Sequence, residues 1–182
     1  KRHTLNARLK ASFDNDDLSR NSGNQIILSP QQTNHIIKDH INGASGRVLY
    51  IGNLKGGVGK TTLSYLLATA AASLGLKTCV LDLDVQANLT RQFTNVKTAQ
   101  PVFFDVIEKK QSIKDVIISI SDTLDLIPSS LKNSLIERAL TVQSPKHQLN
   151  WFNSICLDYL REQYQIIIVD TPPHLTTLNS VF

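Results

Sequence analysis

Eight residues, Lys-Gly-Gly-Val-Gly-Lys-Thr-Thr at positions 55–62, constrain the fold of this chain more than any other stretch. Glycines permit the backbone N–H groups of a tight loop to turn inward, because no Cβ blocks an approaching anion. A lysine adds positive charge beside such a loop, and a threonine hydroxyl is a ligand for Mg²⁺. The spacing therefore predicts a phosphate-binding loop, which requires a strand before it and a helix after it.

The flanking sequence meets both requirements. Residues 48–51, Val-Leu-Tyr-Ile, form a short apolar run that is typical of a strand. After the loop, leucine and alanine recur at helical spacing over residues 63–74, and Gly75 stands where a C-terminal cap is expected. The N-terminal dipole of this predicted helix points at the same anion as the loop.

Predicted strands and helices alternate along the rest of the chain. Further strands are predicted at residues 77–82, 124–127 and 165–170, and helices at 105–108, 113–118, 131–140 and after Pro145. The run at 166–169 is wholly apolar, which is typical of a central parallel strand covered on both faces. This order predicts an α/β fold with a mainly parallel sheet, helices on both faces and right-handed crossovers.

Three aspartates come at the ends of predicted strands. Asp82 and Asp84 end the strand at 77–82, and Asp170 ends the strand at 165–170. The carboxyl ends of parallel strands share one edge of a sheet with the loop, so we expect these carboxylates beside the bound phosphates. Asp170 is a candidate for contact with Mg²⁺, directly or through water. The competing interpretation of each aspartate is a helix cap or a turn residue.

The composition is that of an ordinary globular protein, with 41% hydrophobic and 19% charged residues. No apolar run reaches the ~18–20 residues of a membrane span, and residues 1–20 show no secretory signal. Cys79 and Cys156 have no metal-ligand spacing, so we expect both to be small core residues in a reducing cytoplasm. The net charge of +4 permits contact with nucleic acid without requiring it.

Residues 1–46 are polar and predict a small helical appendage to a main domain at 47–182. Residues 14–24 are typical of a loop, and Ser29-Pro30 predicts the capped start of a helix at 31–41. This segment is either a DNA-reading module or an arm that supports dimerisation. The chain contains no methionine and ends at Phe182 in a predicted helix. We therefore expect part of a longer protein, truncated after the strand at 165–170.

Three ordered motifs resemble the ParA/MinD family of deviant Walker P-loop ATPases, and most closely the ParA partition ATPases. They are residues 55–62, Asp-Leu-Asp-Val-Gln-Ala-Asn at 82–88, and Asp-Thr-Pro-Pro at 170–173. The resemblance covers residues 47–182 and implies a P-loop NTPase fold and Mg²⁺-dependent hydrolysis of ATP to ADP and phosphate. Val85 and Leu54 depart from the usual proline and glutamine, and neither position carries charge.

The resemblance also implies a role for each motif residue. Lys55 matches the signature lysine that reaches the partner subunit's nucleotide in a dimer, and Lys60 matches the ordinary loop lysine. Asp84 matches the carboxylate that positions the attacking water, so these three residues are the predicted catalytic set. The predicted metal-binding residues are Thr61, Asp82 and Asp170. The predicted nucleotide-binding residues are Lys55, Gly56, Gly57, Val58, Gly59, Lys60, Thr61 and Thr62.

By the same resemblance we expect a partition ATPase for plasmid or chromosome segregation, located in the cytoplasm on the nucleoid. ATP drives homodimerisation, the dimer binds DNA non-specifically, and a ParB-type centromere-binding protein stimulates hydrolysis. A MinD-like membrane-associated positioning ATPase is the alternative and needs a C-terminal amphipathic helix. A nucleotide-binding scaffold that rarely hydrolyses ATP is a further alternative. A relative of the nitrogenase iron protein needs cluster cysteines, which Cys79 and Cys156 do not supply.

Overall fold

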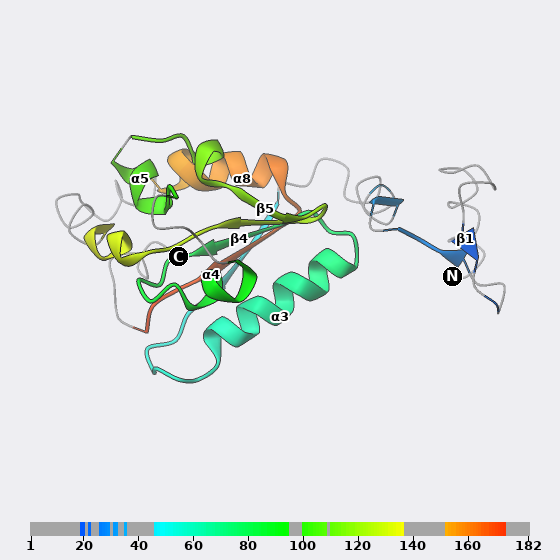
Figure 1. The fold of residues 1–182 in the computed structure, drawn as a ribbon, viewed down its shortest axis with the longest axis horizontal. Helices are drawn as coiled ribbons and strands as arrows, with labels where there is room; N and C mark the ends of the chain where they lie inside the picture. Colours follow the sequence, from blue (N-terminus) through cyan, green and yellow to red (C-terminus); the bar gives the residue numbers. More distant parts are fainter. Residues whose placement is uncertain are drawn as a thin grey trace.

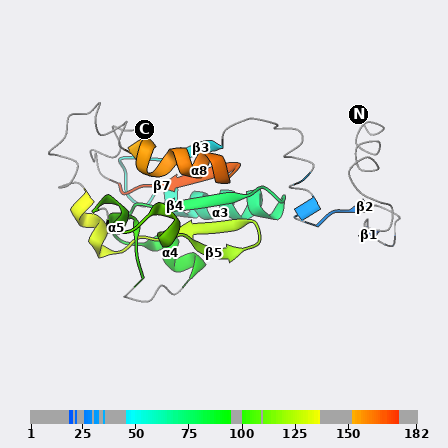
Figure 2. The same cartoon turned by 90° about the horizontal axis from the view of Figure 1, so that it is seen from above.

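The computed structural model describes residues 19–20, 22, 26–29, 31–32, 35, 46–94, 100–108, 110–136 and 152–173. Its main feature is a five-stranded sheet in the order β3-β7-β4-β6-β5 (Figures 1 and 2). Strands β3, β7, β4 and β6 run parallel, and β5 is antiparallel to β6. The predicted α/β fold with a mainly parallel sheet is therefore confirmed. The strands are β3 (Arg47–Ile51), β4 (Thr78–Asp82), β5 (Ile118–Ser121), β6 (Leu124–Ile127) and β7 (Ile166–Asp170).

The two central strands are the most deeply buried. β7 lies between β3 and β4, and β4 lies between β7 and β6. All five residues of β4 are buried, as are the last four of β7. A strand that is covered on both faces buries every side chain, so it shows no alternation of apolar and polar residues. The continuous apolar run at 166–169 thus has the position in the sheet that its sequence predicts.

Strand β5 corrects the helix predicted at residues 113–118. The structure has a short 3-10 helix, η2 (Ile113–Val116), and then a strand that begins at Ile118. The sequence Ile-Ser-Ile-Ser alternates between half-buried and exposed residues, as an edge strand requires. The helical prediction was wrong because the apolar residues before Ile118 fit a helical spacing and concealed the change to a period of two.

Helices cover both faces of the sheet (Figure 1). One face carries α3 (Lys60–Ser73) and α4 (Asn88–Phe93), which meet the sheet in one hydrophobic cluster. The other face carries a larger cluster built with α5, η2 and the last helices of the described chain. On this face, α5 spans Phe103–Ile107, the π-helix η4 spans Asn153–Leu157 and α8 spans Asp158–Gln163. The 3-10 helix η3 (Leu131–Leu135) follows β6.

Two predicted helices differ from the structure at their ends. The helix predicted at 105–108 begins two residues earlier, at Phe103. The one predicted at 131–140 is a 3-10 helix as far as Leu135, and residues 137–140 lie outside the described residues. Both differences concern element boundaries, which depend on local hydrogen bonds more than on hydrophobic spacing.

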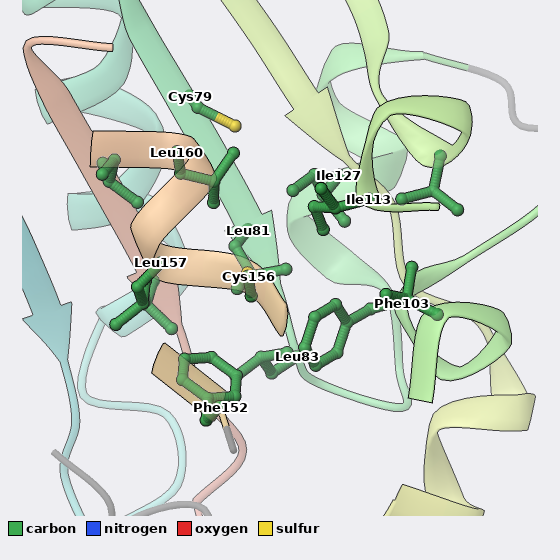
Figure 3. Close-up of a cluster of buried hydrophobic side chains, with 14 of the residues drawn as sticks. Cys79, Leu81, Leu83, Phe103, Ile113, Ile127, Phe152, Cys156, Leu157 and Leu160 are labelled. Atoms are coloured by element: carbon green, nitrogen blue, oxygen red, sulfur yellow. The ribbon is translucent and has the colours of Figure 1, made fainter. Parts of the chain in front are cut away.

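The larger cluster contains both cysteines (Figure 3). Cys79 on β4 and Cys156 on η4 are fully buried and free, which confirms their prediction as core residues. Burial raises the pKa of both thiols, so neither has the thiolate character of a reactive cysteine. The rings of Phe103 and Phe152 pack edge to face with centroids 5.6 Å apart. The cluster thus ties α5 to the helix that precedes β7.

Helix α3 packs on the sheet through small residues. Its buried residues are Ser64, Ala68 and Ala72, whereas Leu66 and Leu74 are 56% and 60% exposed. Small side chains let the helix backbone approach the strands closely, and α3 contacts β3, β4, β6 and β7. The recurring leucines therefore predict the helix correctly but do not mark the face that it buries.

The N-terminal part contains a two-stranded ribbon, β1 (Ser19–Arg20) paired with β2 (Ile26–Ile27). Strand β1 lies within the segment predicted as a loop, and its antiparallel pairing with β2 corrects that prediction. The helix start predicted after Ser29 is present, since the backbone N–H of Gln32 donates to Ser29 Oγ at 3.2 Å. Most of residues 31–41 lie outside the described residues. Within the described part of the chain, no helix combines the length and apolarity that crossing a membrane requires.

Candidate phosphate-binding site

The glycine-rich loop joins β3 to α3 and is exposed. Gly57 and Gly59 have φ angles of 71° and 87°, in the left-handed region that glycine adopts without strain. A Cβ added at either glycine would meet no atom within 4 Å. The carbonyl of Gly59 accepts a hydrogen bond from Leu63 N at 2.8 Å, which starts α3 directly at the loop. The free N–H groups of the first helical turn therefore lie beside open space, where the helix dipole favours an anion.

A pocket of about 430 Å³ lies between this loop and the segment that follows β4. Seven residues predicted for the site lie in its wall, and Lys55, Val58, Asp82 and Asp170 do not. The wall residues that the sequence did not predict follow either β4 or β7. The lining consists of Gly56, Gly57, Gly59, Lys60, Thr61, Thr62, Asp84, Val85, Gln86, Asn88 and Pro173.

The two lysines of the loop lie in different surroundings. Lys60 is the first residue of α3, and its Nζ donates to the carbonyl oxygen of Lys55 at 3.4 Å. It therefore folds back along the loop at the edge of the pocket. Lys55 is exposed, and its backbone N–H donates to Asn53 Oδ1 at 2.9 Å. The charge of Lys60 thus lies at the pocket wall, and the charge of Lys55 lies at the surface of the molecule.

Asp170 lies at the end of β7 and contacts the first turn of α3. Thr61 Oγ1 donates to Asp170 Oδ2 at 2.9 Å, and Ser64 Oγ lies 2.9 Å from Asp170 Oδ1. Burial raises the pKa of Asp170, and these two hydroxyl groups partly oppose that rise. The carboxylate holds Thr61 in a fixed rotamer at the pocket wall. Ser64 was not predicted, although its position three residues after Thr61 places both on one helix face.

Asp84 faces the pocket from the segment after β4 and is 7% exposed. Its Oδ1 accepts a hydrogen bond from Gln86 N at 2.9 Å, and its carbonyl accepts one from Ala87 N at 2.8 Å. Ala87 has a φ angle of 51°, a left-handed conformation that costs a residue with a Cβ about 1 kcal/mol. The tight turn after Asp84 is therefore held in place by surrounding contacts, and it fixes the direction of the carboxylate.

Asp82 lies behind this turn and outside the pocket wall. Its Oδ2 accepts hydrogen bonds from the N–H and the hydroxyl of Thr90 at 2.8 and 2.7 Å, and its Oδ1 accepts one from Asp84 N at 3.1 Å. Burial raises the pKa of Asp82 to about 7, despite these bonds, and the charge of Asp170 adds to the rise. Asp82 and Asp170 are paired in register on adjacent strands. A contact between Asp82 and Mg²⁺ stays a prediction.

Four pocket residues were missing from the prediction. Val85, Gln86 and Asn88 lie in the motif at 82–88, and Pro173 lies in the motif at 170–173. A signal was available for Gln86 and Asn88, because both belong to the motif at 82–88 that already carried the resemblance. Among the described residues, no group of three histidine, cysteine, aspartate or glutamate side chains forms a metal-binding cluster.

Comparison with known proteins extends these observations. A family model described as an AAA domain matches residues 46–182. The chromosome partitioning protein ParA of Caulobacter vibrioides is 30% identical over 134 residues, which cover 72% of this chain and 50% of that protein. The chain spans about half the length of the curated relatives it matches.

Solved structures agree with the fold. A McdA variant from Cyanothece in complex with ATP has a TM-score of 0.66 and 26% identity, and the match covers 76% of this chain and 52% of that one. Cobyrinic acid a,c-diamide synthase from Mycobacterium smegmatis, with a bound ATP analogue and magnesium, has a TM-score of 0.68 and 24% identity, with coverage of 75% and 55%. The matched family model, together with the three motifs and the likeness to ParA and McdA, shows that the chain belongs to the ParA/MinD family of deviant Walker P-loop ATPases.

Proposed function

We propose that this chain carries the ATPase site of a ParA-type partition protein. The observation that supports this most is the pocket itself, which has a volume of about 430 Å³. The glycine-rich loop forms one side of its wall, and Asp84 lies on the other side. Likeness to a chromosome partitioning ParA adds the biological setting. Plasmid or chromosome segregation is the proposed process, in the cytoplasm and on the nucleoid.

The residues of the pocket fit ATP with Mg²⁺. The loop offers backbone donors and open space beside Gly57 and Gly59, which suits phosphate oxygens. Thr61 offers a hydroxyl that Asp170 orients, which suits a bound divalent cation with a carboxylate behind its ligand. When bound, Mg²⁺ neutralises charge on the β- and γ-phosphates. Thr61 would hold the ion, and Asp170 would keep Thr61 in position.

Hydrolysis needs a group that orients water against the γ-phosphate. Asp84 is the proposed group, because this residue lines the pocket opposite the loop and its carboxylate is oriented by a hydrogen bond from Gln86 N. Lys60 is placed to offset the negative charge that the transferring phosphoryl group shares with its leaving oxygen. Phosphoryl transfer of this kind depends on positioning and charge and requires little covalent chemistry from the protein.

Lys55 supports a dimeric active form. Its side chain is exposed and lies outside the pocket wall of its own subunit. We propose that it completes the site of a second subunit across an ATP-bound homodimer. Hydrolysis then depends on dimerisation, because the full positive charge around the phosphates is present only when two subunits meet.

We further propose that the ATP-bound dimer binds DNA non-specifically, and a mobility-shift assay on bulk DNA of unrelated sequence tests this. The full-length protein is expected to shift DNA with Mg²⁺-ATP and not with ADP, with an affinity that falls as salt rises. A net charge of +4 is compatible with this result. The Lys60→Ala variant is the control, since loss of ATP binding should abolish the shift. Equal binding with and without nucleotide would contradict the proposed switch.

Two further assays separate the remaining possibilities. A ParB-type partner from the same replicon should raise the ATPase rate, and a rate unchanged by any such partner would remove this part of the proposal. ATP-dependent binding to anionic lipid vesicles, without binding to DNA, would instead indicate a MinD-like positioning ATPase. Binding of ATP without measurable turnover would indicate a scaffold.

A further inference from the structure

Behind the Asp84 turn, four polar side chains form one buried hydrogen-bonded network. Asp82, Thr90, Ser129 and Asn133 are between 0% and 3% exposed, although none of them lines the pocket. They come from the end of β4, from α4, from the segment after β6 and from η3. Polar groups at such burial are costly unless each finds a partner, so this network is a specific arrangement.

Ser129 is the link between the network and Asp84. Its hydroxyl donates to the carbonyl oxygen of Asp84 at 2.6 Å, and its backbone N–H donates to Thr90 Oγ1 at 3.0 Å. Since a carbonyl only accepts, the hydroxyl hydrogen of Ser129 must point at Asp84. Asn133 Nδ2 then donates to the same Ser129 oxygen at 2.8 Å, which fixes the rotamer.

The network is anchored at both ends. At one end, Asn133 Oδ1 accepts a hydrogen bond from Phe104 N at 3.3 Å, which ties it to α5 and the larger hydrophobic cluster. At the other end, the Thr90 hydroxyl donates to Asp82, which also accepts from Asp84 N. The backbone of Asp84 is therefore held at its N–H by Asp82, and its carbonyl accepts from Ser129 as well as from Ala87 N within the turn.

The turn that this contact holds is strained. Its last residue, Ala87, has a left-handed φ angle, and conformations of this kind persist only where surrounding contacts enforce them. Asp84 lines the pocket from this turn, and its Oδ1 is held by the N–H of Gln86. A small rotation of the peptide unit after Asp84 would redirect the carboxylate, and misplacement by about 1 Å can cost on the order of 10²-fold in rate.

We propose that Ser129 is a positioning residue for ATP hydrolysis: by holding the carbonyl of Asp84, it keeps the Asp84 carboxylate aimed at the γ-phosphate. This inference rests on the proposed function, because it assigns Ser129 a task within the proposed hydrolytic site. Ser129 acts only through Asp84, and nucleotide binding by the loop is independent of it.

The test compares Ser129→Ala with the parent in the full-length protein, measuring kcat for ATP hydrolysis and the Kd for Mg²⁺-ATP separately. Loss of the donor is expected to lower kcat about tenfold and to change Kd by less than about twofold, as for one lost hydrogen bond that acts on positioning. Ser129→Thr keeps the hydroxyl and should restore most of the rate. Ser130→Ala is the matched control, because the Ser130 hydroxyl accepts from Lys132 N and takes part in none of the network hydrogen bonds described above.

A double substitution shows whether the effect passes through Asp84. In an Asp84→Ala background, Ser129→Ala should cause no further loss of the residual rate. An equal loss in both backgrounds, or a parent-like kcat for Ser129→Ala, overturns the inference. Should the alanine variant fail to fold, Ser129→Cys has nearly the same volume and a much weaker donor. A lowered kcat with intact binding in that variant supports the inference, and an unchanged kcat overturns it.

Failure of the proposed function has a different signature. A parent protein that binds Mg²⁺-ATP but shows no turnover, even in its dimeric and DNA-bound form, overturns the hydrolytic site and the inference with it. A parent that turns over normally, with Ser129→Ala equal to it, overturns the role of Ser129 alone.

Discussion

The two walls of the pocket are built in opposite ways. The loop wall is exposed, its glycines stand beside open space, and two of them have left-handed φ angles. The facing wall is a tight turn in which Asp84 is buried and its carbonyl accepts a hydrogen bond from Ser129, 45 residues away in the sequence. The first wall suits the binding of an anion by backbone donors. The second suits the fixed placement of one carboxylate, which is what a reaction controlled by positioning needs.

The largest expected effect concerns the loop wall. Lys60→Ala should weaken Mg²⁺-ATP binding by about 100-fold or more, because it removes a charge-assisted contact to the phosphates. Isothermal titration calorimetry on the monomeric protein measures this directly. Lys55→Ala is the matched control, and its affinity should stay within about threefold of the parent, since this side chain lies outside the pocket wall. Equal losses in the two variants would contradict the different surroundings of the two lysines.

A substitution in the facing wall should lower the rate of ATP hydrolysis without weakening ATP binding. Asp84→Ala is expected to lower kcat about 100-fold, as for the loss of a group that orients water, while ATP-bound dimers still form. Single-turnover hydrolysis and size-exclusion chromatography with Mg²⁺-ATP measure the two properties. Hydrolysis at the parent rate would show that Asp84 does not direct the water and that the facing wall is merely structural.

The buried carboxylate behind the turn gives the stability of the nucleotide-free protein a pH dependence. The pKa of Asp82 is raised from 3.8 to about 7, so the folded state keeps a proton that the unfolded chain releases between these values. The folded state then binds more protons, and stability must fall as pH rises through this window. From pH 5 to pH 7, we expect Asp82 to lower the free energy of unfolding by on the order of 2 kcal/mol.

Urea unfolding at pH 5, 6 and 7, without nucleotide or Mg²⁺, measures this slope. Asp82→Asn has no proton to release, so its slope should be flatter than that of the parent, whatever its absolute stability. Identical slopes in the two proteins would assign the pH dependence to another group.

The smallest expected effect is a difference in the free energy of unfolding between alanine substitutions at two adjacent glycines of the loop. Gly57→Ala should lower the free energy of unfolding by about 1 kcal/mol, because alanine is strained at a φ of 71°. Gly56 has no such angle and has open space around it, so Gly56→Ala should be nearly neutral in the nucleotide-free protein. Thermal unfolding of both variants makes the comparison. Equal destabilisation would mean that steric contact, and not backbone conformation, limits the loop.

Much of the loop wall was predictable because its structure is local. The order of strand, loop and helix follows from the spacing of residues 48–74, and the left-handed angles fall on glycines. The position of Asp170 was also predictable, since parallel strands end at one edge of the sheet. Strand β5 was not predictable from apolar spacing, because a helical period before Ile118 changes to a period of two within a few residues.

The structure of the facing wall could not be predicted from sequence patterns alone. Asp82 and Asp84 are two residues apart at the end of one strand, and the pattern alone allows both carboxylates to face the phosphates. Only Asp84 lines the pocket, because Thr90 and the N–H of Asp84 engage Asp82 from behind. Likewise, the leucines of α3 indicate a helix, but the need for close approach to the sheet selects Ser64, Ala68 and Ala72 as its buried face.

The sequence by itself determined the family, the α/β order and the glycine-rich loop between strand and helix, since each depends on residue types at short, fixed spacings. The tertiary structure alone decided which carboxylate faces the pocket and what holds it. The physical reason is separation along the chain: Thr61 meets Asp170 across 109 residues, and Ser129 meets Asp84 across 45. Hydrogen bonds between such distant residues require the folded sheet to bring them together, and no local pattern encodes them.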